Sequence, residues 1–420
     1  MSNTLLTLTM ITREALRILH NNLVFAKGVN RQYSQEFAQT GAKIGTSVNV
    51  RKPNKYPIRV GQTLSISGTN ETYIPLTLTT QAGVDTSFSS QDLALTLDDF
   101  GKRILSPAMS RVSSKVDFDG LAQAAQIYNN VGTPGTTPGA NTGANLALTT
   151  APQIYLNAGM LMDNMATPRD ENRRVIFNPI AQATSVANLS GLFQDAGSIG
   201  EQYRKGVMGT ALGFEFAMDQ NVNIQGSGTH SATTVVTGTS GQSGSTLAVV
   251  ASNAATVLPG ETFTIANVFS VNPENLQSTG LSQQFVVLPS ANSNGAYTCD
   301  AGGNVVLNIS PAIVGPSSPV NPLQTVTALP AGGASLTFNC AANGSTYVNN
   351  LAYHQDAFTL ATADLILPGG VDFAARENYD GISMRIVRAY DITNDLFPTR
   401  TDILYGFATL RPEMACRIWG

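Results

Sequence analysis

The sequence predicts an α+β fold with an all-β, barrel-like domain inserted into it. Three observations lead to this expectation. A helical repeat of apolar residues runs through 96–130, and apolar and polar residues alternate over 72–79. Between about 223 and 350, Gly, Ser, Thr, Asn and Val dominate and basic residues disappear. Mixed texture then returns over 351–420, so the simplest organisation is an α+β body interrupted by a β domain.

The charge content is low and uneven. Charged residues make up 12% of the 420 residues, about half the usual quarter, whereas apolar residues make up 42%. Such surfaces repel one another weakly and suit a protein that packs against its own copies. Residues 1–130 hold 13 Lys and Arg against 9 Asp and Glu, and residues 206–375 hold 8 acids and no Lys or Arg. We therefore expect any anionic partner near the N-terminal part, because phosphate binding needs cations.

The first predicted helix lies within 4–27. Leu16, Leu19, Leu23 and Ala26 recur there at spacings of three and four, and Thr12 can cap the start. A helix this short is marginal alone and needs a partner surface. It is either a helix of the chain's own core or an arm that reaches a neighbouring subunit.

Residues 46–80 predict a long β-hairpin with strands at about 58–66 and 72–79. Ile74, Leu76 and Leu78 share one face of the second strand, and Arg59 and Glu71 could help to set the register. Two limbs of about 12–15 residues would reach about 40–50 Å, so the hairpin must lie on its own body or on a neighbour. In an assembly, we expect the neighbour to cover the three apolar side chains.

A long helix is predicted over 96–130, with a capping box at 96–99. Pro107 lies inside this pattern and would break an internal hydrogen bond. Either the helix is kinked, or a second helix starts with Ser106 as its cap and Pro107 at its first position. The apolar stripe consists of Phe100, Ile104, Ala108, Val112 and Val116.

The remaining elements are shorter. We expect helices near 151–165 and 179–193, a strand at 173–177 closed by a turn, and a loop and strand over 206–218. Six short runs within 223–350 predict a small barrel or sandwich. These runs are 233–237, 246–250, 262–269, 284–288, 305–309 and 335–338. Over 351–420 we expect helical and mixed structure with strands at 383–390 and 402–410.

Nothing in the sequence indicates an enzyme, a metal or a cofactor. The phosphate-binding, dinucleotide, zinc-protease and serine-hydrolase motifs are all missing. His354 and Asp356 form one close acid–histidine pair, which we interpret as structural. The three cysteines suit reduced thiols of a cytoplasmic protein better than a Cys299–Cys340 bridge. No run approaches the roughly 20 apolar residues of a membrane span, and the first residues do not resemble a signal peptide.

The densest basic cluster is RKPNKYPIR, residues 51–59. Basic residues around a tyrosine can bind phosphates and bases, so contact with a nucleic acid is one interpretation. A contact between subunits or a solvated loop is the other.

Several stretches, in this order, resemble the major capsid (coat) proteins of tailed double-stranded-DNA bacteriophages, in the podophage branch with an inserted β-barrel. TYIPLTLTTQAGVDTSF (72–88) is similar to the returning strand of the extended loop, and LTLDDF (95–100) to the start of the spine helix. VIFNP (175–179) and GVMG (206–209) resemble body motifs. GETFTIANVFSVNP (260–273) and QQFVV (283–287) resemble the insert, and YGFATLRPEMACRI (405–418) resembles the closing strand.

This resemblance implies a domain order. It gives an N-terminal arm (1–45), an extended loop (46–80), a spine helix with the first part of a body of peripheral and axial domains (81–222), the inserted β domain (223–350) and the return to the body (351–420). It also implies a non-enzymatic subunit of an icosahedral shell. Arg59, Glu71, Ile74, Leu76 and Leu78 are then expected between subunits.

The implied partners are other copies in hexamers and pentamers, a separate scaffolding protein, a portal protein and packaged double-stranded DNA, without a membrane. Only about 45 residues precede the loop and lack a long coiled-coil pattern, which favours the separate scaffold. Assembly would take place in the host bacterial cytoplasm. We expect Arg13, Arg17, Lys27 and Arg31 to face the lumen of the virion capsid.

Two other classes compete with this interpretation. A surface-layer, tail or adhesin subunit would suit the Thr- and Asn-rich β region. A polysaccharide-processing enzyme would need a pair of carboxylates, which nothing in the sequence marks.

Overall fold

The computed structural model describes residues 8–32, 47–59, 61–62, 66, 71–89, 105–138, 152–189, 209–230, 235–252, 254–290, 295–317, 321–339 and 344–420. The chain forms two compact units, each assembled from separate stretches. The first comprises Met1–Arg51, Tyr73–Leu121 and Phe358–Leu410, and the second comprises Lys52–Thr72, Ala122–Ala357 and Arg411–Gly420.

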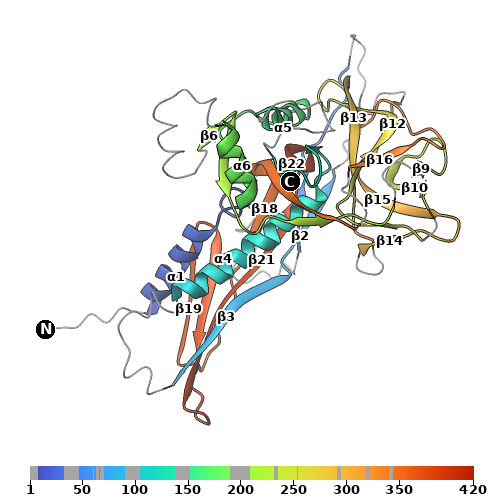
Figure 1. The fold of residues 1–420 in the computed structure, drawn as a ribbon. Coiled ribbons are helices and arrows are strands. Elements are labelled where there is room, and N and C mark those ends of the chain that lie inside the picture. The colour runs from blue at the N-terminus through green and yellow to red at the C-terminus, as the bar shows by residue number, and fades with distance from the viewer. Residues whose placement is uncertain are drawn as a thin grey trace. The chain divides into compact units, whose positions relative to one another are not determined.

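A five-stranded antiparallel sheet organises the first unit (Figure 1). Its order is β18-β21-β20-β19, and β3 pairs with β21 along the whole length of β3. Asp380 and Gly381 join β19 to β20 with positive φ angles of 52° and 75°, as a tight hairpin turn requires. The strands are β3 (Thr80–Ser89), β18 (Phe358–Ala363), β19 (Phe373–Tyr379), β20 (Ile382–Arg388) and β21 (Leu396–Thr409).

Two helices pack on this sheet. Helix α1 (Leu8–Asn22) contacts β19, β20 and α4 (Ser106–Leu121), and α4 also contacts β3. The Asp117 carboxylate, which is buried, accepts hydrogen bonds from the Val24 N–H at 2.7 Å and the Ala26 N–H at 3.0 Å, so α4 holds the segment that follows α1. The first helix of the sequence is therefore part of its own unit's core.

The long predicted helix is shorter at its C-terminal end than expected. α4 ends at Leu121 and a 3₁₀ turn, Ala122–Gln126, follows. Pro107 lies in the first turn of α4, where its missing N–H leaves no hydrogen bond unmade. The capping box at 96–99 lies outside the described residues, as do Phe100 and Ile104.

The extended hairpin differs from the prediction in its first strand. β1 (Ser47–Arg51) pairs with β2 (Tyr73–Thr77), with Val50 opposite Ile74, whereas the first strand was expected at 58–66. Residues 52–59 form no strand. The Lys52 N–H still donates to the Thr72 carbonyl at 2.8 Å, and the pairing ends there because Pro53 lacks the N–H group that a ladder needs.

A seven-stranded mixed sheet forms the body of the second unit. Its order is β4-β22-β17-β5-β7-β6, and β8 also pairs with β17. The helices α5 (Gln153–Asn164) and α6 (Pro179–Leu189) bury Tyr155 and Ala181 in the same core as Val175 and Phe177 of β5. The strands are β4 (Asn130–Val131), β5 (Arg173–Phe177), β6 (Thr210–Ala211), β7 (Phe214–Met218), β8 (Ile224–Gly226), β17 (Thr346–His354) and β22 (Ala415–Trp419).

Residues 351–420 contain strands, and their only helical pieces are the 3₁₀ turns Gln355–Ala357 and Pro412–Met414. The helical texture expected there was wrong, because β17 and β22 are central strands buried on both faces. Such strands give continuous apolar runs without alternation.

The inserted region forms a barrel-like sheet with the order β16-β12-β13-β15-β10-β9. Its end strands meet: Val236 bridges Ser335, and the Leu336 N–H donates to the Val235 carbonyl at 2.8 Å. β11 (Thr256–Val257) and β14 (Tyr297–Thr298) form a separate pair. The six strands are β9 (Val236–Thr237), β10 (Gly244–Val250), β12 (Thr262–Val271), β13 (Ser278–Val287), β15 (Asn304–Ile313) and β16 (Leu336–Asn339).

Candidate functional site

The described part of the chain offers no sign of a metal centre or a membrane span. No group of three His, Cys, Asp or Glu residues there could hold a metal ion. No helix in these ranges is long and apolar enough to cross a membrane.

The apolar residues expected between subunits are covered by their own chain. Leu76 is 0% exposed and Leu78 is buried, and they pack with Ala361, Ala408 and Leu410. Ile74 is half-buried at the edge of this cluster. We expected a neighbour to cover these side chains; instead β18 and β21 of the same unit cover them, because β2 contacts β21 directly.

The exposed part of the extended loop lies between its strands. Tyr56 and Ile58 are 57% and 84% exposed, so this part of the loop presents apolar surface to solvent. Arg59 donates to the carbonyl of Gly61, and both Arg59 and Glu71 are exposed. A role for Arg59 and Glu71 in contacts between subunits stays a prediction.

The basic side chains of the N-terminal segment contact groups of their own unit. Arg13 pairs with Glu377 at 3.4 Å, Arg17 with Glu14 at 2.6 Å and Arg31 with Asp380 at 2.6 Å. Lys27 Nζ donates to the carbonyl of Asn21 at 3.2 Å. The positive charge of this segment is thus largely balanced locally.

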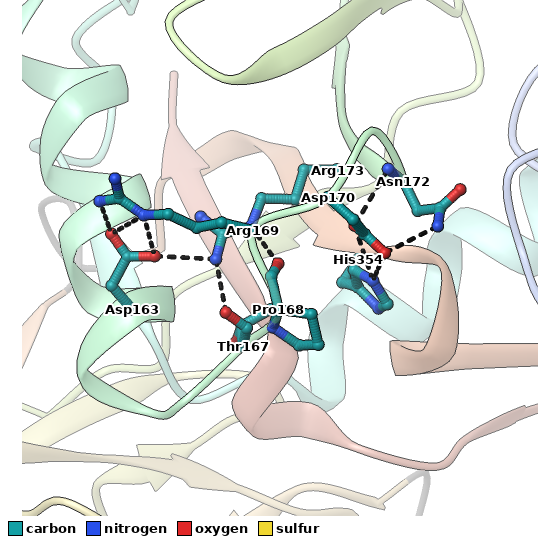
Figure 2. Close-up of polar contacts among 8 residues, drawn as sticks. All are labelled: Asp163, Thr167, Pro168, Arg169, Asp170, Asn172, Arg173 and His354. Atoms are coloured by element: carbon teal, nitrogen blue, oxygen red, sulfur yellow. Dashed lines mark hydrogen bonds and ion pairs between the residues drawn. The ribbon is translucent and has the colours of Figure 1, made fainter.

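The charged loop between α5 and β5 is held in place by side-chain contacts that the sequence did not predict (Figure 2). Arg173, only 5% exposed, donates to the carbonyls of Thr167 at 2.6 Å and Pro168 at 2.8 Å and to Asp163 at 2.8 Å. Arg169 reaches the same carboxylate, with Nε at 3.0 Å from each oxygen. Burial opposes ionisation, yet the hydrogen bonds from Arg169 and Arg173 keep the pKa of Asp163 below its usual value.

His354 anchors the other end of this loop. Its Nε2 lies 3.1 and 3.2 Å from the two oxygens of Asp170, and its Nδ1 accepts the Asp356 N–H at 3.2 Å. Partial burial opposes ionisation of Asp170, but hydrogen bonds from Asn172 and His354 hold its pKa below the usual value. The expected His354–Asp356 pair is therefore a structural arrangement whose main partner is Asp170.

A hollow of about 460 Å³ lies beside the loop. Its apolar lining comes from α5 and the β6–β7 turn, and its polar lining comes from the charged loop. The apolar residues are Leu156, Met160, Leu212 and Phe214, and the charged ones are Asp163, Arg169, Asp170 and Arg173. The combination of an apolar floor and a polar edge is typical of a protein interface.

Buried polar contacts connect the insert to the body. Arg417 is 0% exposed and donates to the carbonyls of Ile127 and of Gly260 in the insert, both at 2.6 Å. Burial lowers its pKa to about 10. Asn130 accepts from Asn339 of the insert at 3.0 Å and from Trp419 at 3.1 Å. Nothing in the sequence marked these residues.

Comparison with known proteins gives a family match over the whole chain. The family model described as P22 coat protein, gene protein 5, matches residues 1–420. No curated protein matches. Similar solved structures include that of Mycobacterium phage Che8, at 12% identity and a TM-score of 0.45, covering 94% of this chain and 90% of that chain. The capsid of cyanophage P-SCSP1u is 12% identical with a TM-score of 0.43, and the match covers 89% of this chain and 83% of that chain. The capsid of Ralstonia phage GP4 is 9% identical with a TM-score of 0.38, and the match covers 93% of this chain and 86% of that chain.

Proposed function

The chain belongs to the P22 coat protein family, and from this premise we propose that its shell consists of hexamers and pentamers around packaged double-stranded DNA. The protein is a major capsid subunit with a structural role, and copies of it assemble into the capsid of a phage virion. The match over residues 1–420 is the observation that carries this conclusion. The surface-layer, tail and adhesin alternative gains no support from it.

The proposal includes a separate scaffolding protein, a portal protein and assembly in the host cytoplasm. In described residues 8–32 the one helix, α1, has 15 residues, and several of its charged side chains pair within the chain. This segment offers no long coiled coil that could act as a built-in scaffold. The exposed residues Tyr56 and Ile58 offer apolar surface for a neighbour, but they do not by themselves set the curvature of a shell.

Electron microscopy tests this proposal. The chain expressed alone should form closed particles of mixed size, and co-expression with the assembly proteins of its phage should give one size. Uniform, correctly sized shells from the chain alone would exclude the separate scaffold. Flat arrays or tubes under both conditions would contradict the icosahedral shell.

We also propose that the N-terminal segment with Arg13, Arg17, Lys27 and Arg31 faces the lumen. Because much of its charge is balanced by Glu14, Glu377 and Asp380, the DNA would be neutralised mainly by mobile counterions. An amine reagent that cannot enter the particle should label Lys27 in dissociated subunits and spare it in DNA-filled particles. Equal labelling in both states would place this segment on the outside.

A further inference from the structure

The hollow beside α5 has charges that already have partners. Arg169 and Arg173 share the Asp163 carboxylate, and Asp170 is held by Asn172 and His354 (Figure 2). A charged occupant would have to break these pairs or add an unbalanced charge beside them. An uncharged, apolar occupant would leave them intact and cover the floor.

The loop at the edge of this hollow is already fixed in place. Arg173 and His354, both almost fully buried, hold the loop backbone and Asp170 from the protein side, while Arg169 is mostly exposed. A surface that is ordered before it binds loses little conformational entropy on association. The hollow is therefore rigid, and its exposed Leu156 supplies apolar surface. A contact between subunits requires both properties.

Helix α6 offers the matching surface. It contains no charged residue, and Asn178 caps its start by accepting the Ala181 N–H at 2.9 Å. Its buried side packs on the body through Ala181 and Ser185. Its other side leaves Ile180 66% exposed, and Ala183 and Ala187 are exposed at helical spacing from it. This face carries no charge that would repel an apolar partner, and covering it removes apolar area from water.

We propose that the exposed face of α6, centred on Ile180, docks into the α5 hollow of a second copy of this chain. The occupant is another copy because the protein is a shell subunit, so copies of itself are the partners it meets in assembly. In a ring of subunits the α6 face of each copy would meet the hollow of the next copy, so the proposed contact is heterologous and joins subunits head to tail. Heterologous contacts close into rings when the rotation allows it, which is what a capsomer needs.

Cysteine cross-linking tests the contact. The double variant Ile180→Cys/Leu156→Cys, oxidised after assembly, should give a ladder of linked chains under non-reducing conditions. Each single variant should show only unlinked chains under the same non-reducing conditions. The unmodified chain reports any background from the native cysteines, two of which, Cys299 and Cys416, are buried. The matched control is Ile180→Cys/Ile392→Cys, since Ile392 is 84% exposed but lies outside the hollow.

Shells of the double variant without cross-links, or equal linkage in the Ile392 control, would overturn the proposal. A second measurement uses Ile180→Asp, which should raise the concentration needed for assembly roughly tenfold while the thermal unfolding of the monomer stays unchanged. Leu156→Lys in the same chain should restore assembly by placing opposite charges across the contact. Unchanged assembly of Ile180→Asp would contradict the contact. Because the unmodified chain must form shells in parallel, failure of this contact is distinguishable from failure of the proposed shell.

Discussion

Single buried side chains carry interactions that the sequence does not announce. The main side-chain partner of His354 is Asp170, which is 184 residues away at 3.1 Å, whereas the carboxylate of Asp356, close to it in the chain, lies 3.8 Å from its ring. Arg417 lies in an apolar strand, and its guanidinium donates to the carbonyls of Ala125, Ile127 and Gly260. Spacing along a chain predicts pairs within one helix or strand, but these partners are brought together by the sheet. Site residues of this kind could not be predicted without the fold.

Replacing Arg417 should be among the most damaging changes at a single polar position. Arg417→Met removes three donors from buried carbonyls, and we expect a loss of about 3 kcal/mol in the free energy of unfolding. Urea unfolding followed by circular dichroism measures it. Arg169→Ala, at a mostly exposed position, is the matched control and should stay within about 1 kcal/mol. Equal effects would mean that the contacts of Arg417 with the insert are unimportant.

The stabilising role of Asp163 should depend on pH. Its folded-state pKa lies below the ordinary 3.8, so its contribution is complete above about pH 4 to 5 and is lost as the pH falls through the folded value. Asp163→Asn should therefore be less stable than the parent at pH 7, and the difference in stability should shrink as the pH falls toward 2. Urea midpoints at both values provide the check, and a difference that persists at pH 2 would point to packing as the cause.

At the scale of elements, local pattern predicted some strands well and others poorly. The strands at 173–177, 246–250 and 305–309 lie where they were expected, because turns bound them and their residues suit a pleated surface. The first strand of the extended hairpin was expected at 58–66 and lies instead at Ser47–Arg51, and residues 52–59, which contain Pro53 and Pro57, form no strand. The strand β17 was missed because central strands lack alternation, and the closing strand expected within 405–418 is divided between the end of β21 and β22. The inferred hairpin was right in existence and wrong in extent.

Two substitutions in the extended hairpin should affect folding and assembly differently. Leu76→Asp places a charge in a fully buried site and should cost about 3–5 kcal/mol, so little folded monomer should remain. Ile58→Asp changes an exposed side chain and should leave the monomer intact while assembly fails. Circular dichroism and sedimentation compare the two variants. A stable Leu76→Asp monomer would mean that β2 is not part of the core.

The inserted barrel should fold as a separate fragment. Its apolar interior, including Phe263, Phe285 and Leu307, comes from its own strands, and its end strands are joined to each other. A fragment of residues 223–350 should be soluble and β-rich by circular dichroism, with a cooperative thermal transition. A disordered fragment would show that Arg417, Asn130 and the rest of the body are needed to hold it.

At the scale of the whole molecule, the order in which composition and apolar pattern change along the chain was more informative than any motif. The α+β class, the β insert and the family were predicted from that order, and the family match confirms the last. The division into two units assembled from separate stretches could not be predicted, because composition changes gradually where the chain passes from one unit to the other. The low charge content indicated self-association, but the surfaces proposed to make the contacts could be chosen only once the structure showed which side chains are exposed.

The composition of the first unit from three separate stretches affects its synthesis on the ribosome. Leu76 needs Ala408 and Leu410 to cover it, and these residues are made more than 300 positions later. At roughly 5–20 residues per second, β2 waits about 20–70 s for its partner strand. The insert can close during that interval, since its strands lie within 235–339. Each nascent subunit therefore carries an uncovered apolar hairpin through most of its translation, and a chaperone bound to that hairpin would delay assembly until β21 emerges.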